Sequence, residues 1–289
     1  MNKEEKINKI LKALYKSDIK LTGEEVYEFL KFFEIPENKE NNSVKENIFN
    51  KWILRFKSKD TEVTIPEHEN HFCLFEHGFI KTDSIKMYIP LDYEHLYEGA
   101  NQIFDFLEEN NINHSSKIAN IIRNDNLVIR LNNEEEAKKL QEFIEKNEYI
   151  KEGLIPVNPF CINKNGVGYG YDNTISYNQC LADALAYYIN NMKENNATIE
   201  DINIKTFYNS LEEVQARPDI LRTFEYADEK PTSLGSLYLA TELIKLSLTT
   251  NSLEDYYNFT RQAISTNKRD LSNKLVNKAI EYQEKGKGR

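Results

Sequence analysis

Residues 84–144 switch between the hydrophobic period of a strand and that of a helix, and this pattern restricts the possible folds. It predicts strands over 84–90, 115–122 and 126–131, with one helix over 93–109 and another beginning after Asn133. The residues expected to face inward are Leu96, Ile103, Phe104 and Leu107 in the first helix, and Ala137, Leu140, Phe143 and Ile144 in the second. The order strand, helix, strand, strand, helix predicts an α+β fold, with an antiparallel or mixed sheet and helices on one face.

The flanking parts of the chain carry mainly helical patterns. Apolar residues three and four apart predict amphipathic helices over 5–17, 22–35 and 43–57, before short strand patterns at 62–65 and 72–75. Further helices are expected over 199–214, 232–248, 253–265 and 269–284. We therefore predict a helical N-terminal subdomain over 1–60, an α+β domain over 61–198 and a helical C-terminal portion over 199–289.

Composition and charge exclude several classes of protein. The chain has 289 residues and a formal net charge of −10, whereas a nonspecific nucleic-acid binder carries a basic face, so no nucleic-acid partner is expected. No apolar run reaches the roughly 18 residues that span a bilayer, and the first residues lack a secretory signal, so no membrane is expected either. The three cysteines form no CxxC pair, which predicts reduced thiols in the cytoplasm. The abundance of Asn, Lys, Ile and Glu fits an AT-rich bacterial or phage gene.

Neither a metal nor a nucleotide cofactor is expected. His68, His71, Cys73 and His77 are close in sequence, but structural zinc sites join two separated ligand pairs and no second pair follows. Glycines at positions 166, 168 and 170 do not match a nucleotide-binding loop, and favour a hairpin or strand that another backbone approaches closely. Their N–H groups remain an alternative anion contact. Cys180 lies in a helical pattern and is expected to be buried rather than reactive.

Basic side chains gather around the predicted strands, in a chain that is acidic overall. The cluster consists of Lys86, Lys117, Arg123 and Arg130, with Tyr88 and His114 beside them. Arginine holds phosphate in a bidentate fork, and a lysine flanked by other cations gives up its proton more easily and can act as a base. A tyrosine or histidine can protonate a leaving oxygen. These groups suffice for β-elimination of phosphate, although lysines at strand edges are commonly only solvated.

A resemblance favours that chemistry. The Lys86-x-Tyr88 strand followed by Lys117 resembles the bacterial phosphothreonine lyases and the lyase domains of lanthipeptide synthetases, which carry a Lys-x-His strand and a second lysine at about this separation. The motifs at 123–129, 159–160, 166–168 and 176–178 resemble the HopA-type effector family, which includes a plant-pathogen effector and lyase partners of kinases in peptide-modifying pathways. Together the likeness covers roughly residues 80–190.

The resemblance assigns roles by position. It makes Lys117 the general base and Lys86 the group that polarises the substrate, with Arg123 on the phosphate and Arg130 as a weaker phosphate ligand. Tyr88 stands where the lyases have an acid histidine, so either Tyr88 or His114 would donate the proton, or catalysis has been lost. A second departure is Gln179, near the position where effector relatives have an arginine.

The resulting hypothesis is that the protein is a lyase. It would eliminate phosphate from a phosphorylated Ser or Thr of a peptide or protein and leave a dehydroamino acid, as in lanthipeptide biosynthesis. A separate kinase would supply the substrate, because no kinase motif is present. The rival hypothesis is a non-catalytic effector or anti-defence protein that binds a protein partner with a degenerate lyase scaffold. An effector would be secreted into a host cell instead of remaining in the cytoplasm.

Overall fold

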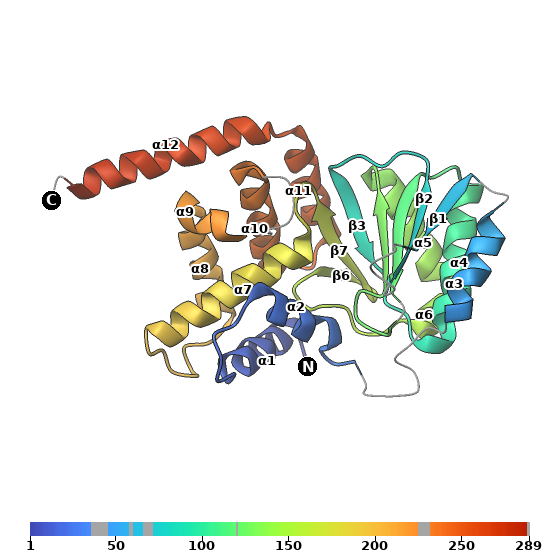
Figure 1. The fold of residues 1–289 in the computed structure, drawn as a ribbon, viewed down its shortest axis with the longest axis horizontal. Coiled ribbons are helices and arrows are strands. Elements are labelled where there is room, and N and C mark those ends of the chain that lie inside the picture. Colours follow the sequence, from blue (N-terminus) through green and yellow to red (C-terminus); the bar gives the residue numbers. More distant parts are fainter. Residues whose placement is uncertain (36–45, 58–59, 66–71, 120, 225–231, 288–289) are drawn as a thin grey trace. The chain divides into compact units, whose positions relative to one another are not determined.

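The computed structural model describes the chain except for residues 36–45, 58–59, 66–71, 120, 225–231 and 288–289 (Figure 1). The described residues form two compact units. One unit comprises Met1–Phe29 together with Tyr171–Arg289, and the other comprises Leu30–Gly170. Below, the first is called the helical unit and the second the sheet unit.

The sheet unit is an α+β structure, as predicted. Its elements are α3 (Glu46–Phe56), β1 (Thr61–Thr64), β2 (Phe72–His77), β3 (Ser84–Tyr88), α4 (Tyr93–Glu109), β4 (His114–Ala119), β5 (Leu127–Leu131), α5 (Glu134–Lys146), α6 (Glu148–Gly153), β6 (Ile162–Lys164) and β7 (Val167–Asp172), whose last two residues belong to the other unit. The seven strands are ordered β1-β2-β4-β5-β3-β7-β6. The pairs β1–β2, β2–β4, β4–β5, β3–β5 and β6–β7 are antiparallel.

The predicted helices α4 and α5 begin where side chains cap them. The Asp92 carboxylate accepts a hydrogen bond from the backbone N–H of His95 at the start of α4, and Asn133 accepts one from Glu136 at the start of α5. Each cap satisfies a backbone donor that has no partner within the helix. The amphipathic pattern of both helices then directs their apolar stripes toward the sheet, with Leu107 and Leu140 fully buried.

Helices α3, α4 and α5 cover one face of the sheet (Figure 1). In an antiparallel sheet, alternate residues of a strand point to opposite faces, and the odd-numbered residues of β3 and β5 are fully or almost fully buried among apolar side chains. On β2, Phe75 contacts Phe104 of α4, with 4.6 Å between the ring centroids. We call this the helix-covered face, and the even-numbered residues of β3 and β5 lie on the opposite one.

The helical unit consists of α-helices and one short 3₁₀ helix in its described part. They are α1 (Lys3–Tyr15), α2 (Gly23–Phe32, whose last three residues belong to the sheet unit), α7 (Tyr177–Glu194), α8 (Ile204–Gln215), α9 (Pro218–Leu221), η1 (Arg222–Phe224), α10 (Leu234–Thr249), α11 (Leu253–Ser265) and α12 (Lys268–Lys287). At Gly235 the backbone of α10 approaches that of α12 so closely that a Cβ atom would lie 2.3 Å from the carbonyl oxygen of Lys268. None of the described helices combines the length and apolar character needed to cross a bilayer.

The predicted domain boundaries at 60 and 198 remain predictions. Within the helical unit α1 packs with α7 and α8, and within the sheet unit α3 packs on the sheet. In α3 the indole N–H of Trp52 donates to the side-chain oxygen of Asn101 on α4, over 2.8 Å. The apolar stripes of α1 and α3 thus pack against elements that lie far away in the sequence.

Candidate functional site

Four of the six predicted site residues lie on one face of three adjacent strands. Together with Ser115 they form what we call the cationic face: Lys86 and Tyr88 on β3, Lys117 and Ser115 on β4, and Arg130 on β5. Lys86 pairs with Arg130, which also pairs with Ser115. Tyr88 pairs with Val128, which also pairs with Lys117. Because directly paired residues share a face, the side chains form two parallel rows, Ser115-Arg130-Lys86 and Lys117-Val128-Tyr88.

The strand register sets the distances between the side chains of these rows. Directly opposed side chains in antiparallel strands have Cβ atoms about 5 Å apart, and strands two apart are separated by about 10 Å. The backbones at Lys117 and Tyr88 are thus about 10 Å apart, with the smaller Val128 between them. Lysine and arginine side chains are long enough to extend over Val128, which is only 4% exposed.

Placing cations directly opposite one another has an electrostatic cost. Like charges at paired positions of two strands are destabilising, and Lys86 is directly opposite Arg130. Lys86 is only 5% exposed and Tyr88 2%, so water screens this part of the face poorly. The ammonium of Lys86 lies 5.5 Å from the centre of the Tyr88 ring. Both cations are of a type that binds anionic oxygens through charge-assisted hydrogen bonds.

Lys117 is half-buried and lies against an aromatic ring. Its Nζ atom is 3.5 Å from the ring centroid of Phe72, the first residue of β2. The register explains the contact: Lys117 pairs with Leu74, and Phe72, two residues earlier, points to the same face. A cation so close to the face of a ring is held by the electrostatic field of that ring.

Gly168 on β7 lies beside Tyr88. A Cβ atom at Gly168 would lie 3.4 Å from the Cβ atom of Tyr88, and β3 and β7 are neighbours in the sheet. The glycine-rich segment forms the hairpin β6–β7, in which Ile162 pairs with Tyr169. The predicted hairpin is therefore confirmed, and it borders the cationic face.

Arg123 lies in the connection between β4 and β5, off the strands of the cationic face. Its Nε atom is 2.7 Å from a carboxylate oxygen of Asp125, and both side chains are buried. The amide of Asn124 bonds the carbonyl oxygen of Leu30, and Asn126 bonds both backbone groups of Leu91. Asp125 thus offsets the charge of Arg123, and Arg130 becomes the better-placed arginine for a ligand on the face.

His114 lies on the helix-covered face. It is three residues before Lys117 on β4, an odd spacing, so the two side chains point to opposite faces of the sheet. His114 is fully buried, its ring stacks on Phe104 with centroids 5.4 Å apart, and its Nδ1 atom is 2.8 Å from the hydroxyl of Ser116. Burial, reinforced by the nearby His77, lowers the pKa of His114 to about 3. Of the two predicted proton donors, only Tyr88 therefore lies on the same face of the sheet as Lys117.

The depressed pKa of His114 predicts an acid-sensitive fold. The unfolded chain binds a proton at this side chain near pH 6.5, and the folded protein only near pH 3, so falling pH favours unfolding. Above pH 6.5 His114 should therefore lower the free energy of unfolding only slightly. Between pH 7 and pH 5 it should lower that free energy by about 2 kcal/mol. Urea unfolding at the two pH values measures the loss. The variant His114→Phe keeps the stacked ring, and an undiminished loss in that variant would refute the assignment.

The expected absence of a metal site remains a prediction. Positions 68 and 71 lie outside the described residues. Cys73 is fully buried and burial raises the pKa of its thiol to about 12, so the thiolate that metals bind is disfavoured. The Nδ1 atom of His77 is 3.0 Å from the hydroxyl of Thr61. Among the described residues, no group of three or more His, Cys, Asp or Glu is placed to hold a metal ion.

Two further residues of the sequence hypothesis lie on α7 in the helical unit. Cys180 is fully buried, as predicted, and both burial and the nearby Asp183 raise the pKa of its thiol, so it is a poor nucleophile. The side-chain amide of Gln179 donates to both carboxylate oxygens of Asp183, over 3.3 and 3.4 Å. Burial raises the pKa of Asp183 to about 6, and the Gln179 amide opposes that shift.

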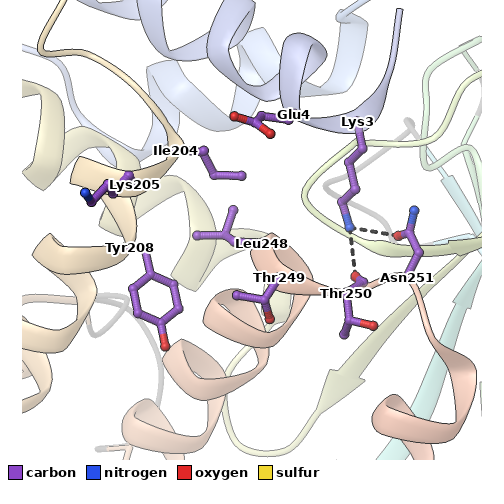
Figure 2. Close-up of a pocket in the computed structure, with 9 residues that line it drawn as sticks. All are labelled: Lys3, Glu4, Ile204, Lys205, Tyr208, Leu248, Thr249, Thr250 and Asn251. Carbon is purple, nitrogen blue, oxygen red and sulfur yellow. Dashed lines mark hydrogen bonds between the residues drawn. The ribbon is translucent and has the colours of Figure 1, made fainter.

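The helical unit contains a separate surface pocket of about 390 Å³ (Figure 2). Ile204, Leu248 and the ring of Tyr208 form its apolar part, and the ammonium of Lys3 donates to the side-chain oxygen of Asn251 over 2.8 Å. The pocket contains none of the predicted site residues, and the dashed contacts in Figure 2 show Lys3 bonded to the protein. The cationic face is therefore the better candidate for chemistry.

Comparisons with known proteins do not assign a family. No family model matches the chain, and no curated protein matches it. Solved structures that are similar to it include two effector proteins of Pseudomonas syringae. The effector from pathovar tomato strain DC3000 is 12% identical, with a TM-score of 0.49 over 73% of this chain and 94% of that one. The effector from pathovar syringae strain 61 is 10% identical, with a TM-score of 0.47 over 72% of this chain and 92% of that one. At this identity and TM-score the likeness assigns neither a family nor an activity.

Two residues of the site were missing from the sequence hypothesis. Ser115 is two residues before Lys117, so strand periodicity alone was enough to place both side chains on one face. Phe72 belongs to a different strand, 45 positions from Lys117 in the printed sequence, and only the β2–β4 register brings them together. No local pattern indicated that contact.

Proposed function

We propose that the cationic face binds the phosphate of a phosphorylated Ser or Thr in a peptide and eliminates it, leaving a dehydroamino acid. The observation that supports this proposal is the shared face of Lys86, Tyr88, Lys117 and Arg130 on three adjacent strands. Elimination needs a base for the Cα proton, an acid for the leaving oxygen and cations for the phosphate charge, and this set contains all three.

Each residue has a role that follows from its place on the face. Lys117, at one end of its row, acts as the base, and Tyr88, at the other end, gives a proton to the leaving phosphate oxygen. Arg130 and Lys86, paired in the neighbouring row, hold the phosphate and stabilise the charge that develops on it. Ser115, also in that row, can donate a hydrogen bond to a phosphate oxygen. A separate kinase supplies the phosphopeptide.

Mass spectrometry of synthetic phosphothreonine and phosphoserine peptides tests the proposal. We expect the peptide to lose the mass of one phosphoric acid while an equal amount of inorganic phosphate is released. A phosphatase would also release phosphate, but its peptide product keeps the oxygen and is heavier by one water. Addition of a thiol to the product confirms the dehydroamino acid, because a new carbon–carbon double bond accepts the thiol and a hydroxyl group does not.

The same experiment distinguishes the non-catalytic alternative. A protein that binds the phosphopeptide but leaves its mass unchanged, alone and in the presence of the kinase, would be a phosphopeptide-binding effector or anti-defence protein. A protein that neither binds nor changes the phosphopeptide would exclude both functions for this face. The matching peptides without phosphate serve as controls for binding that does not depend on the anion.

A further inference from the structure

The contact between Lys117 and Phe72 is specific to one protonation state of the lysine. An ammonium is attracted to the face of an aromatic ring, whereas a neutral amine is not attracted in the same way. The 3.5 Å between Nζ and the ring centroid is well inside the 6 Å over which this attraction operates. The half-buried position of both residues limits screening by water.

Other charged groups on the same sheet face influence the same ammonium. From β5, Arg130 lies in the neighbouring row, and from β3, Lys86 lies beyond it; both disfavour a further positive charge. From β2, Glu76 lies two residues past Leu74 and is exposed, so its favourable effect is screened. The only other groups of the two rows that can ionise or donate are Tyr88 and Ser115. The ring of Phe72 therefore supports the charged form of Lys117 on a face that also carries Arg130 and Lys86.

We propose that Phe72 is a positioning residue for Lys117, and that its ring receives the ammonium formed when Lys117 removes the Cα proton. The inference rests on the proposed function. The ring stabilises the lysine more as its charge develops, so it stabilises the transition state more than the ground state. It also holds Nζ over one spot on the face before the reaction begins.

The step balances as follows. The lone pair of Lys117 Nζ takes the Cα proton, and the electrons of the Cα–H bond become the second bond between Cα and Cβ. The bond from Cβ to the phosphate oxygen breaks, and that oxygen leaves with its electron pair and takes the proton of the Tyr88 hydroxyl. The products are a dehydroamino acid and inorganic phosphate, and the proton on Lys117 returns to Tyr88 through water. Nothing is oxidised or reduced, so no further reactant is required.

The variants Phe72→Leu and Phe72→Tyr test the inference. Leucine keeps apolar packing without the ring, whereas tyrosine keeps the ring. In Phe72→Leu the ammonium of Lys117 loses a stabilising contact, so the lysine gives up its proton at lower pH. In a plot of kcat/KM against pH, the rise on the acid side should therefore move to lower pH by about half a unit to one unit. The kcat of this variant on the high-pH plateau should fall several-fold, while KM for the phosphopeptide stays unchanged because Arg130 and Lys86 still hold the phosphate. Phe72→Tyr keeps the ring, so the position of the rise on the acid side and the kcat at high pH should both match those of the wild type.

An NMR titration of the lysine side chains separates this inference from the proposed function. The Cε resonance assigned to Lys117, identified by its loss in Lys117→Ala, should titrate at lower pH in Phe72→Leu than in the wild type or in Phe72→Tyr. Equal titration midpoints in all three proteins would overturn the role of Phe72, whether or not the protein is an enzyme. If the midpoint moves as expected but no phosphopeptide is consumed, the ring holds the ammonium and the proposed elimination is wrong.

Discussion

Lys117→Ala should abolish most of the elimination activity while leaving the fold and phosphopeptide binding intact. A positioned general base contributes about 10²- to 10⁴-fold to a rate, so kcat should fall by that factor. KM should change little, because Arg130 and Lys86 occupy the neighbouring row and hold the phosphate independently of the base. Lys117 is only half-buried on β4, so its replacement leaves the fully buried core of the sheet unit unchanged.

A matched control is available in the same sheet. Lys164 is an exposed residue of β6, and Lys164→Ala removes a strand lysine of the same charge away from the cationic face. We expect its kinetics to match those of the wild type. Single-turnover measurement of dehydrated peptide, with circular dichroism to confirm folding, supplies the comparison. Full activity in a folded Lys117→Ala protein would remove the base from the proposed mechanism, and equal losses in both variants would point to a general effect of charge.

Strand periodicity was sufficient to predict some neighbours on the site and insufficient for others. Lys86 and Tyr88 are two residues apart on one strand, so a period of two already places them on the same face. Lys117 joins them only through the register of β4 and β5, which the spacing of residues does not specify. A slip of one residue between these strands would have placed Lys117 on the helix-covered face.

Two residues that the sequence hypothesis places in the site, His114 and Arg123, lie away from the cationic face in the structure. His114 was grouped with Lys117 because the two are close in sequence, although their odd spacing on a strand already separates them across the sheet. Arg123 was assigned to the phosphate by resemblance, whereas the carboxylate two residues later is the partner that the structure gives it. In both cases the local sequence already contains the feature that separates the residue from the cationic face.

The domain boundaries depend on contacts that no local pattern contains. The helices α1, α2 and α3 were each predicted from an apolar stripe, and all three are present. Which surface a stripe packs against depends on residues far away in sequence, such as the Asn101 partner of Trp52 on α4. Periodicity therefore predicts the presence of amphipathic helices but not the unit to which each one belongs.

Trp52→Ala should be among the most destabilising substitutions in the sheet unit. The side chain of Trp52 is fully buried, its ring lies 4.9 Å from that of Tyr97 and 5.5 Å from that of Phe75, and its N–H donates to Asn101. Truncating a buried tryptophan costs about 3–5 kcal/mol, because a cavity remains and the partner of its hydrogen bond is left buried without a donor. Leu54 on the same helix is 70% exposed, and Leu54→Ala should change stability by less than about 0.5 kcal/mol.

Urea unfolding followed by circular dichroism measures this difference, since Trp52 is the single tryptophan of the chain and fluorescence would vanish with it. The outcome also bears on the site, because α3 packs on the face of the sheet opposite to the lysines. If the strand register that aligns Lys117, Val128 and Tyr88 depends on the helix-covered core, amide exchange in β4 and β5 should accelerate in Trp52→Ala and not in Leu54→Ala. Unchanged exchange in a destabilised Trp52→Ala protein would show that α3 unfolds by itself and that the cationic face does not depend on it.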